Sequence, residues 1–160
     1  MSDLPMIVIE RRYTAQAPDL WALWTTPAGL ESWWGPDGFA VSVQAMDLRA
    51  GGELRYTMTA VDPQMVAFMQ TNGMPIATDA QITYDAVQPM TRLAYRHLVD
   101  FVPGHAPYHT RMVVEFIPDG ATVLLRLTFD QMHDAMWSQR QRMGWEQELG
   151  KLEMVLSGGG

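Results

Sequence analysis

The chain of 160 residues contains no cysteine, which excludes disulfide bonds, thiolate metal sites and cysteine nucleophiles. No apolar run is long enough to cross a bilayer, and the N-terminus lacks the basic and apolar segments of a signal peptide. Only 11 Lys and Arg stand against 18 Asp and Glu, without a basic cluster. Nucleic acids and anionic membranes are bound through basic faces, so neither partner is expected. A soluble, cytoplasmic protein is the resulting prediction.

Methionine and tryptophan are abundant instead, with 13 and 6 residues. Methionine adapts to irregular apolar shapes, so its abundance fits either a loosely specified core or an adaptable binding cavity. The length suits one domain, which we expect over residues 1–156. Residues 157–160 end in three glycines and are expected to form a flexible tail.

Hydrophobic periodicity predicts one long helix after a run of strands. A strand over 6–13 precedes two short helices, which begin near Pro18 and Pro27. Apolar residues then alternate with polar ones in six further segments: 39–47, 53–58, 81–86, 93–99, 110–116 and 123–129. The short turns between them favour an antiparallel meander. A helix over 131–156 would cover the sheet and leave a cavity between the two.

Three groups of residues carry a family resemblance. They are LWALWTTP at 20–27 followed by WWGP at 33–36, DLRAGG at 47–52 with Tyr56, and MGWE at 143–146 leading into Leu149 and Leu152. In this order they resemble the activator of heat-shock protein 90 ATPase homologue 1-like family, within the START-like/SRPBCC superfamily. The resemblance implies an α+β helix-grip fold, β-α-α-β6-α, whose curved antiparallel sheet wraps around a long C-terminal helix and a hydrophobic cavity. The family's eukaryotic co-chaperone has a further N-terminal domain, for which 160 residues leave no room, so a chaperone partner is not expected.

Strand alternation assigns nine residues to the concave face of the sheet. These are Tyr56, Met58, Tyr84, Tyr95, His97, Thr110, Met112, Leu125 and Leu127. From the long helix we expect Met136 and Met143, together with Trp137 or Trp145. His97 is either a core histidine paired with Tyr84, Tyr95 or the backbone, or the contact for a ligand's polar group. Glu146 and Glu148 are expected to face solvent, and Gly144 is expected to mark a close backbone approach.

Two segments are candidates for covering the cavity. Trp33 and Trp34 are expected over its mouth. Between the second and third meander strands, Asp62-Pro63 and Asn72-Gly73 predict the start and the end of a short helix with Met65, Phe68 and Met69 on one face. This helix either caps the cavity or lies on the surface and lengthens a hairpin.

Metal binding is not expected, although the chain has four histidines. His97, His105, His109 and His133 lie near Asp100, but strand alternation places His97 and His109 on opposite faces. We expect no cofactor either.

The favoured function is therefore binding of a small hydrophobic ligand that carries one polar group. No catalytic residue is assigned, because the sequence contains no nucleophile elbow, phosphate loop or paired carboxylates. The alternatives are a chaperone-associated interaction module, or an enzyme that uses His97 and a tyrosine as acid and base on an apolar substrate. A homodimer is compatible with the sequence.

Overall fold

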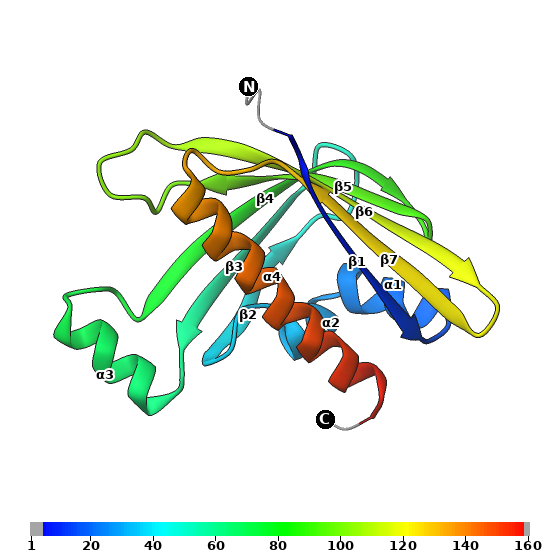
Figure 1. Cartoon of the computed structure of the whole chain (residues 1–160), viewed down its shortest axis with the longest axis horizontal. Coiled ribbons are helices and arrows are strands. Elements are labelled where there is room, and N and C mark those ends of the chain that lie inside the picture. The colour runs from blue at the N-terminus through cyan, green and yellow to red at the C-terminus, as the bar shows by residue number, and fades with distance from the viewer. Residues whose placement is uncertain (1–4, 159–160) are drawn as a thin grey trace.

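The computed structural model describes residues 5–158 and contains one antiparallel sheet with four helices in this part of the chain (Figure 1). The strands are β1 (Ile7–Thr14), β2 (Phe39–Met46), β3 (Glu53–Ala60), β4 (Ala77–Gln88), β5 (Arg92–Val99), β6 (Tyr108–Asp119) and β7 (Thr122–Phe129). The helices are α1 (Ala17–Thr25), α2 (Pro27–Trp33), α3 (Pro63–Thr71) and α4 (Ala135–Leu156). No helix among the described residues is long and apolar enough to span a membrane.

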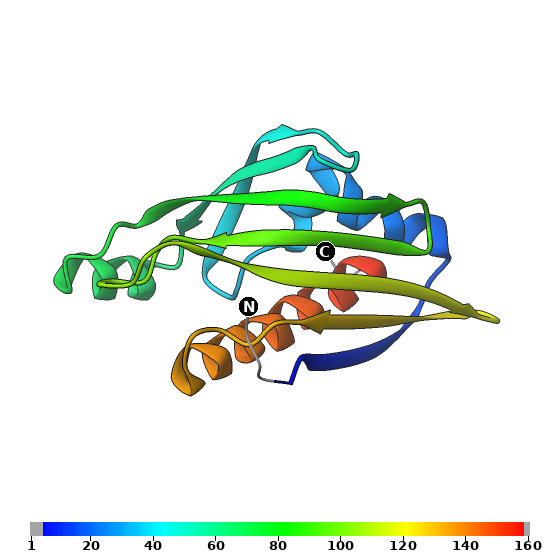
Figure 2. The ribbon, with the colours of Figure 1, turned by 90° about the horizontal axis from the view of Figure 1, so that it is seen from above.

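The predicted meander is confirmed. The strand order is β1-β7-β6-β5-β4-β3-β2, so strands consecutive in sequence are neighbours from β2 to β7. The first strand closes the series on β7, with Ile7 opposite Phe129 and Thr14 opposite Thr122. Figure 2 shows the curved sheet on one side of the molecule with α4 running across it. The α+β helix-grip architecture is thus confirmed.

Proline lies in the first turn of α1, α2 and α3, as the sequence predicts, and polar side chains cap the starts of α2 and α4. Thr26 separates α1 from α2, and its hydroxyl accepts a hydrogen bond from the Gly29 N–H at 3.0 Å. The long helix begins at Ala135, four residues later than predicted. Its N-terminal N–H groups are capped by Asp134, whose carboxylate accepts from the Trp137 N–H at 2.8 Å.

The short helix predicted between the second and third meander strands is confirmed as α3. The Asp62 carboxylate accepts a hydrogen bond from the Met65 N–H at 3.1 Å, and Pro63 is the first helical residue. At the other end Gly73 adopts a positive φ of 67°. In Figure 1 the helix projects from the body beyond the ends of β3 and β4.

Register shifts interrupt simple alternation in β2, between Val43 and Ala45, and in β4. A bulge shifts the register of β4 against β5 between Tyr84 and Ala86. Beyond it, Val87 packs against the core and pairs with Leu93. The extra residue therefore moves the inward position from Ala86 to Val87.

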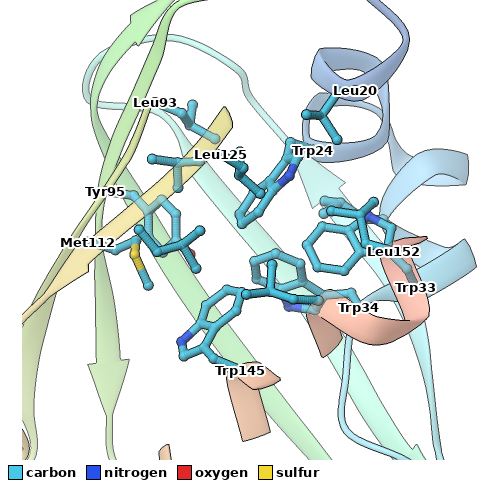
Figure 3. Packing of buried hydrophobic residues seen from close by; sticks show 14 of the residues in the cluster. Leu20, Trp24, Trp33, Trp34, Leu93, Tyr95, Met112, Leu125, Trp145 and Leu152 are labelled. Atoms are coloured by element: carbon cyan, nitrogen blue, oxygen red, sulfur yellow. The ribbon is translucent and has the colours of Figure 1, made fainter. Parts of the chain in front are cut away.

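Tryptophans form the centre of the core at one end of the sheet. Trp24 and Trp33 are each 1% exposed, and their ring centroids lie 4.7 Å apart. Trp24 also stacks on Trp145 of α4, with centroids 5.9 Å apart and planes inclined by 14°. Figure 3 shows these rings together with Trp34, facing Leu125 on the sheet. The two short helices therefore fill this end of the space between sheet and α4.

Candidate functional site

A cavity of about 300 Å³ remains between the sheet and α4. Its volume is at the lower end of those found for small-molecule sites. Seven of the predicted wall residues line it: Tyr56, Met58, Tyr95, His97, Thr110, Met112 and Trp145. Trp34 and Trp137 line it as well. The structure thus brings together residues from β3, β5, β6, α4 and the segment after α2.

Three predicted strand residues lie on the correct face but outside the cavity. Tyr84, Leu125 and Leu127 are almost fully buried and belong to the hydrophobic core. Leu125 faces the tryptophan cluster in Figure 3. Alternation assigns the face of a residue, whereas its distance from the cavity depends on how far α1 and α2 extend along the sheet. The prediction that these three line the cavity is wrong.

The prediction is also wrong for two methionines of α4. Met136 and Met143 are 54% and 56% exposed and point away from the sheet. Successive helical residues are rotated by about 100°, so Met143 lies about 160° from Trp145 on the helix circumference. Met136, nine residues before Trp145, is displaced by about 180°. A single apolar stripe cannot hold both these methionines and Trp145.

Of the residues assigned to the cover, only Trp34 lines the cavity. Trp34 lines the cavity, but Trp33 lies in the core, where its Nε1–H donates to the Leu23 carbonyl at 2.8 Å. None of the three residues assigned to the cap, Met65, Phe68 and Met69, lines the cavity. Within α3 the Met69 side chain is buried, whereas Phe68 is 58% exposed. The helix α3 connects β3 to β4 and lies beyond the ends of these strands (Figure 1). The predicted cap over the cavity is therefore wrong, and α3 fits the alternative of a surface helix that lengthens a hairpin.

Two polar groups of β5 are buried without partners at the cavity. The ring of His97 lines the cavity, and its Nε2 is buried and has no hydrogen-bond partner among the described residues. The same is true of the Tyr95 hydroxyl. Burial lowers the pKa of His97 to about 4, so the imidazole is neutral at pH 7. The alternative of a histidine satisfied by Tyr84, Tyr95 or the backbone is therefore wrong.

Replacement of His97 by leucine is expected to leave the stability within about 1 kcal/mol of wild type, because an unpaired polar group is exchanged for an apolar one. His109→Leu is the matched control, since His109 is exposed on the outer face and pairs with Leu98. Urea unfolding at pH 7 measures both variants. A loss of several kcal/mol in His97→Leu alone would show that the imidazole is satisfied in the fold.

A carboxyl that sequence reasoning assigned to solvent also lines the cavity. Glu148 is half-buried, and its Oε1 accepts a hydrogen bond from the Gly35 N–H at 2.8 Å. Burial raises the pKa of Glu148 to about 7, although the Gly35 N–H and Lys151 oppose this. The neighbouring Glu146 pairs with Arg11 at 2.6 Å and does not line the cavity. The sequence spacing indicates this inward position, because Glu148 comes three residues after Trp145 and four before Leu152 and so lies on the same face of the helix as both.

Gly144 borders the cavity beside this carboxyl. No backbone approaches it: a Cβ atom there would meet only Glu148 Oε2, at 4.0 Å. The expected close backbone approach is therefore wrong. The missing side chain instead leaves free space on the face of α4 that borders the cavity.

The histidines do not converge. His97 points inward, whereas His109 is exposed, as alternation predicts. His105 and His133 lie 4.4 Å apart between ring centroids, and the Tyr108 hydroxyl is 2.7 Å from His133 Nδ1. Within residues 5–158 no three histidine, aspartate or glutamate side chains are placed to hold a metal ion.

Comparison with known proteins places this geometry in a family. The family described as "Activator of Hsp90 ATPase homolog 1-like protein" matches residues 14–157. No curated protein matches the chain.

Solved structures share the fold at low sequence identity. A Chromobacterium violaceum protein aligns with a TM-score of 0.78 and 20% identity, over 95% of this chain and 96% of its own. An AHSA1-like protein from Aeromonas hydrophila gives 0.74 and 20%, over 96% and 93%. The AHSA1 protein from Silicibacter pomeroyi gives 0.74 and 19%, over 95% and 97%. Together with the match over most of its length, these similarities show that the chain belongs to the Activator of Hsp90 ATPase homolog 1-like family.

Proposed function

We propose that this chain binds a small, largely apolar molecule carrying a polar group in the cavity between the sheet and α4. The observation that carries the proposal is a mainly apolar cavity with the unpaired His97 Nε2 and Tyr95 hydroxyl buried at its wall. Buried polar groups are nearly always hydrogen-bonded in folded proteins, so unpaired ones call for an explanation. A ligand's polar group would satisfy them.

The wall combines adaptable and rigid apolar surfaces. Met58, Met112 and Met132 come from the sheet and from the segment before α4, and their flexible side chains can adjust to a ligand's outline. Trp34 and Trp145 add flat surfaces. Two positions are available for a polar group: His97, which the sequence predicts, and Glu148, which the structure adds.

The cavity can be filled from α4 without disturbing the sheet. Gly144→Leu would add a side chain next to the cavity, whereas Gly150→Leu would place the same side chain on the same helix at a residue outside its wall. Both replacements favour the helix by about 1 kcal/mol, so stability does not separate them. We expect Gly144→Leu to weaken binding of naphthylethanol at least about tenfold, and Gly150→Leu to leave it unchanged.

Isothermal titration calorimetry on the full chain measures these affinities, with circular dichroism as the check on folding. Equal affinity in wild type and both variants would place the binding site outside the cavity. Absence of binding by the wild type to naphthylethanol and to its amine and carboxylate counterparts would contradict the proposed function.

A further inference from the structure

We infer that the preferred ligand carries a protonated amine, held beside Glu148 within an aromatic surround of Trp34, Tyr56 and Trp145. This inference rests on the proposed function, because it concerns the chemistry of a ligand in the same cavity. It adds the sign of the ligand's charge and the end of the cavity at which the charge lies.

The Glu148 carboxyl is held in one orientation. Its Oε1 accepts the Gly35 N–H at 2.8 Å, and the Gly35 carbonyl accepts from Lys151 Nζ, also at 2.8 Å. The backbone of one residue, Gly35, thus ties two side chains of α4 to the segment after α2. Oε2 makes no hydrogen bond among the described residues, and beside it Gly144 presents no side chain. A fixed acceptor with free space next to it is suited to receive an N–H donor.

Aromatic rings surround the same end of the cavity. Trp34 stands nearly perpendicular both to Trp145, at 87° with centroids 5.4 Å apart, and to Tyr56, at 88° and 6.2 Å. All three line the cavity. Trp34 directly precedes Gly35, and Trp145 lies one turn before Glu148, so the rings and the carboxyl share one end. Aromatic faces attract ammonium groups, more strongly when water is excluded.

The two phenols of the cavity wall, Tyr56 and Tyr95, are neutral at pH 7. Burial raises the pKa of Tyr56 and of Tyr95 well above its usual value, and the charge of Glu148 raises both further. Both phenols therefore remain protonated at neutral pH and carry no negative charge of their own. The carboxylate is the negative group that a cationic ligand would meet here.

Arg111 and Arg140 line the cavity, Lys151 lies beside Glu148 outside the wall, and each of the three already contacts another group. Arg111 is exposed and bonds Asp130 through Nη2 at 2.8 Å. Arg140 is exposed and lies over Trp137, 5.2 Å from the ring centroid. Lys151, the cation beside Glu148, donates to the Gly35 carbonyl. An anionic group would thus lie toward Arg140, away from Glu148 and its aromatic surround.

The inference gives amine binding a pH dependence. With a Glu148 pKa of about 7, the ionised fraction rises from about a tenth at pH 6 to about nine tenths at pH 8. The titratable and charged groups that line the cavity with Glu148 are Arg140 on α4, Tyr56 on β3, Tyr95 and His97 on β5, and Arg111 on β6; Lys151 lies beside Glu148 without lining the cavity. His97 is neutral over this range, because its pKa is about 4. Affinity for an amine should therefore rise about tenfold from pH 6 to pH 8.

Three probes with one ring system separate the head groups: naphthylethylamine, naphthylethanol and naphthylacetate. Calorimetry on the full chain at pH 8 should show the amine binding at least about tenfold more tightly than the alcohol, and the carboxylate most weakly. Glu148→Gln keeps an oxygen for the Gly35 N–H and removes the charge. It should lower the affinity for the amine to the value that the wild type shows for the alcohol, and it should abolish the rise with pH.

Glu146→Gln is the matched control, because Glu146 lies on the same helix, pairs with Arg11 and does not line the cavity. It should behave as wild type with all three probes. If the three probes bind with equal affinity and Gly144→Leu abolishes their binding, the preference for an amine is wrong and the proposed function still holds. The same conclusion follows if the carboxylate binds most tightly. If none of the three binds, both proposals fail.

Discussion

Replacing Trp24 with alanine is expected to lower the free energy of unfolding by about 3–5 kcal/mol. Trp24 is 1% exposed, and its ring lies against Trp33, Trp34, Trp145 and Phe116. It therefore connects α1, α2, α4 and the sheet, and its removal leaves a cavity shared by all four. This is the largest stability effect we expect from a single replacement in the chain.

Chemical denaturation at pH 7 measures this loss, with Trp137→Ala as the control. Trp137 is half-buried near the start of α4, where Arg140 lies over it. Its removal is expected to reduce the unfolding free energy by about 1 kcal/mol, because the half-buried Trp137 ring buries less apolar area on folding than the Trp24 ring does. Similar small losses in both variants would contradict the central position of Trp24 in the core.

The second large effect is a pH-dependent gain of stability in Glu148→Gln. The pKa of this carboxyl is about 7 in the folded chain, against 4.5 for an ordinary glutamate. Between these values the folded state binds more protons than the unfolded state, so the contribution of Glu148 to stability falls as pH rises. The difference corresponds to at most about 3 kcal/mol at pH 8. Glutamine does not ionise, so the variant should exceed wild type by up to this amount at pH 8 and equal it near pH 4.

Thermal or urea unfolding of both proteins across this pH range gives the difference directly. Glu146→Gln serves as the control: it removes a surface ion pair with Arg11 and should lower stability by less than about 1 kcal/mol at neutral pH. A Glu148→Gln variant that follows the wild-type curve at every pH would show that the carboxyl is solvated. That result would also remove the expected rise of amine affinity between pH 6 and pH 8.

Local patterns predicted the fold because each element carries its own signal. The Pro residues at 18, 27 and 63 lie in the first turns of three of the helices, and alternation marks the strands from Phe39 to Phe129. The start of β4 was missed because Ala77–Ala80 lack large apolar residues. The bulge near Asp85 was missed as well, since nothing in the local sequence distinguishes it from regular alternation.

The site was less predictable than the fold because it depends on the rotation of each residue around the α4 axis and on packing between elements distant in sequence. An apolar stripe extended upstream from Trp145 predicts Met136 and Met143 at the cavity, although the helical rotation between them and Trp145 places them on the opposite face. The same rotation would have identified Glu148 as inward. Tyr84 and Leu127 lie outside the cavity because α1 and α2 fill their end of the sheet, which no local pattern records.

The methionine methyl groups provide the most direct test of the cavity as the binding site. Met58, Met112 and Met132 line it, whereas Met90, Met136 and Met154 are exposed elsewhere and serve as internal controls. In a nuclear magnetic resonance titration of the methyl-labelled full chain with naphthylethylamine, the resonances of the first three should shift and saturate together, and those of the controls should stay in place. Saturable shifts confined to Met90, Met136 or Met154, with Met58, Met112 and Met132 unmoved, would contradict the account.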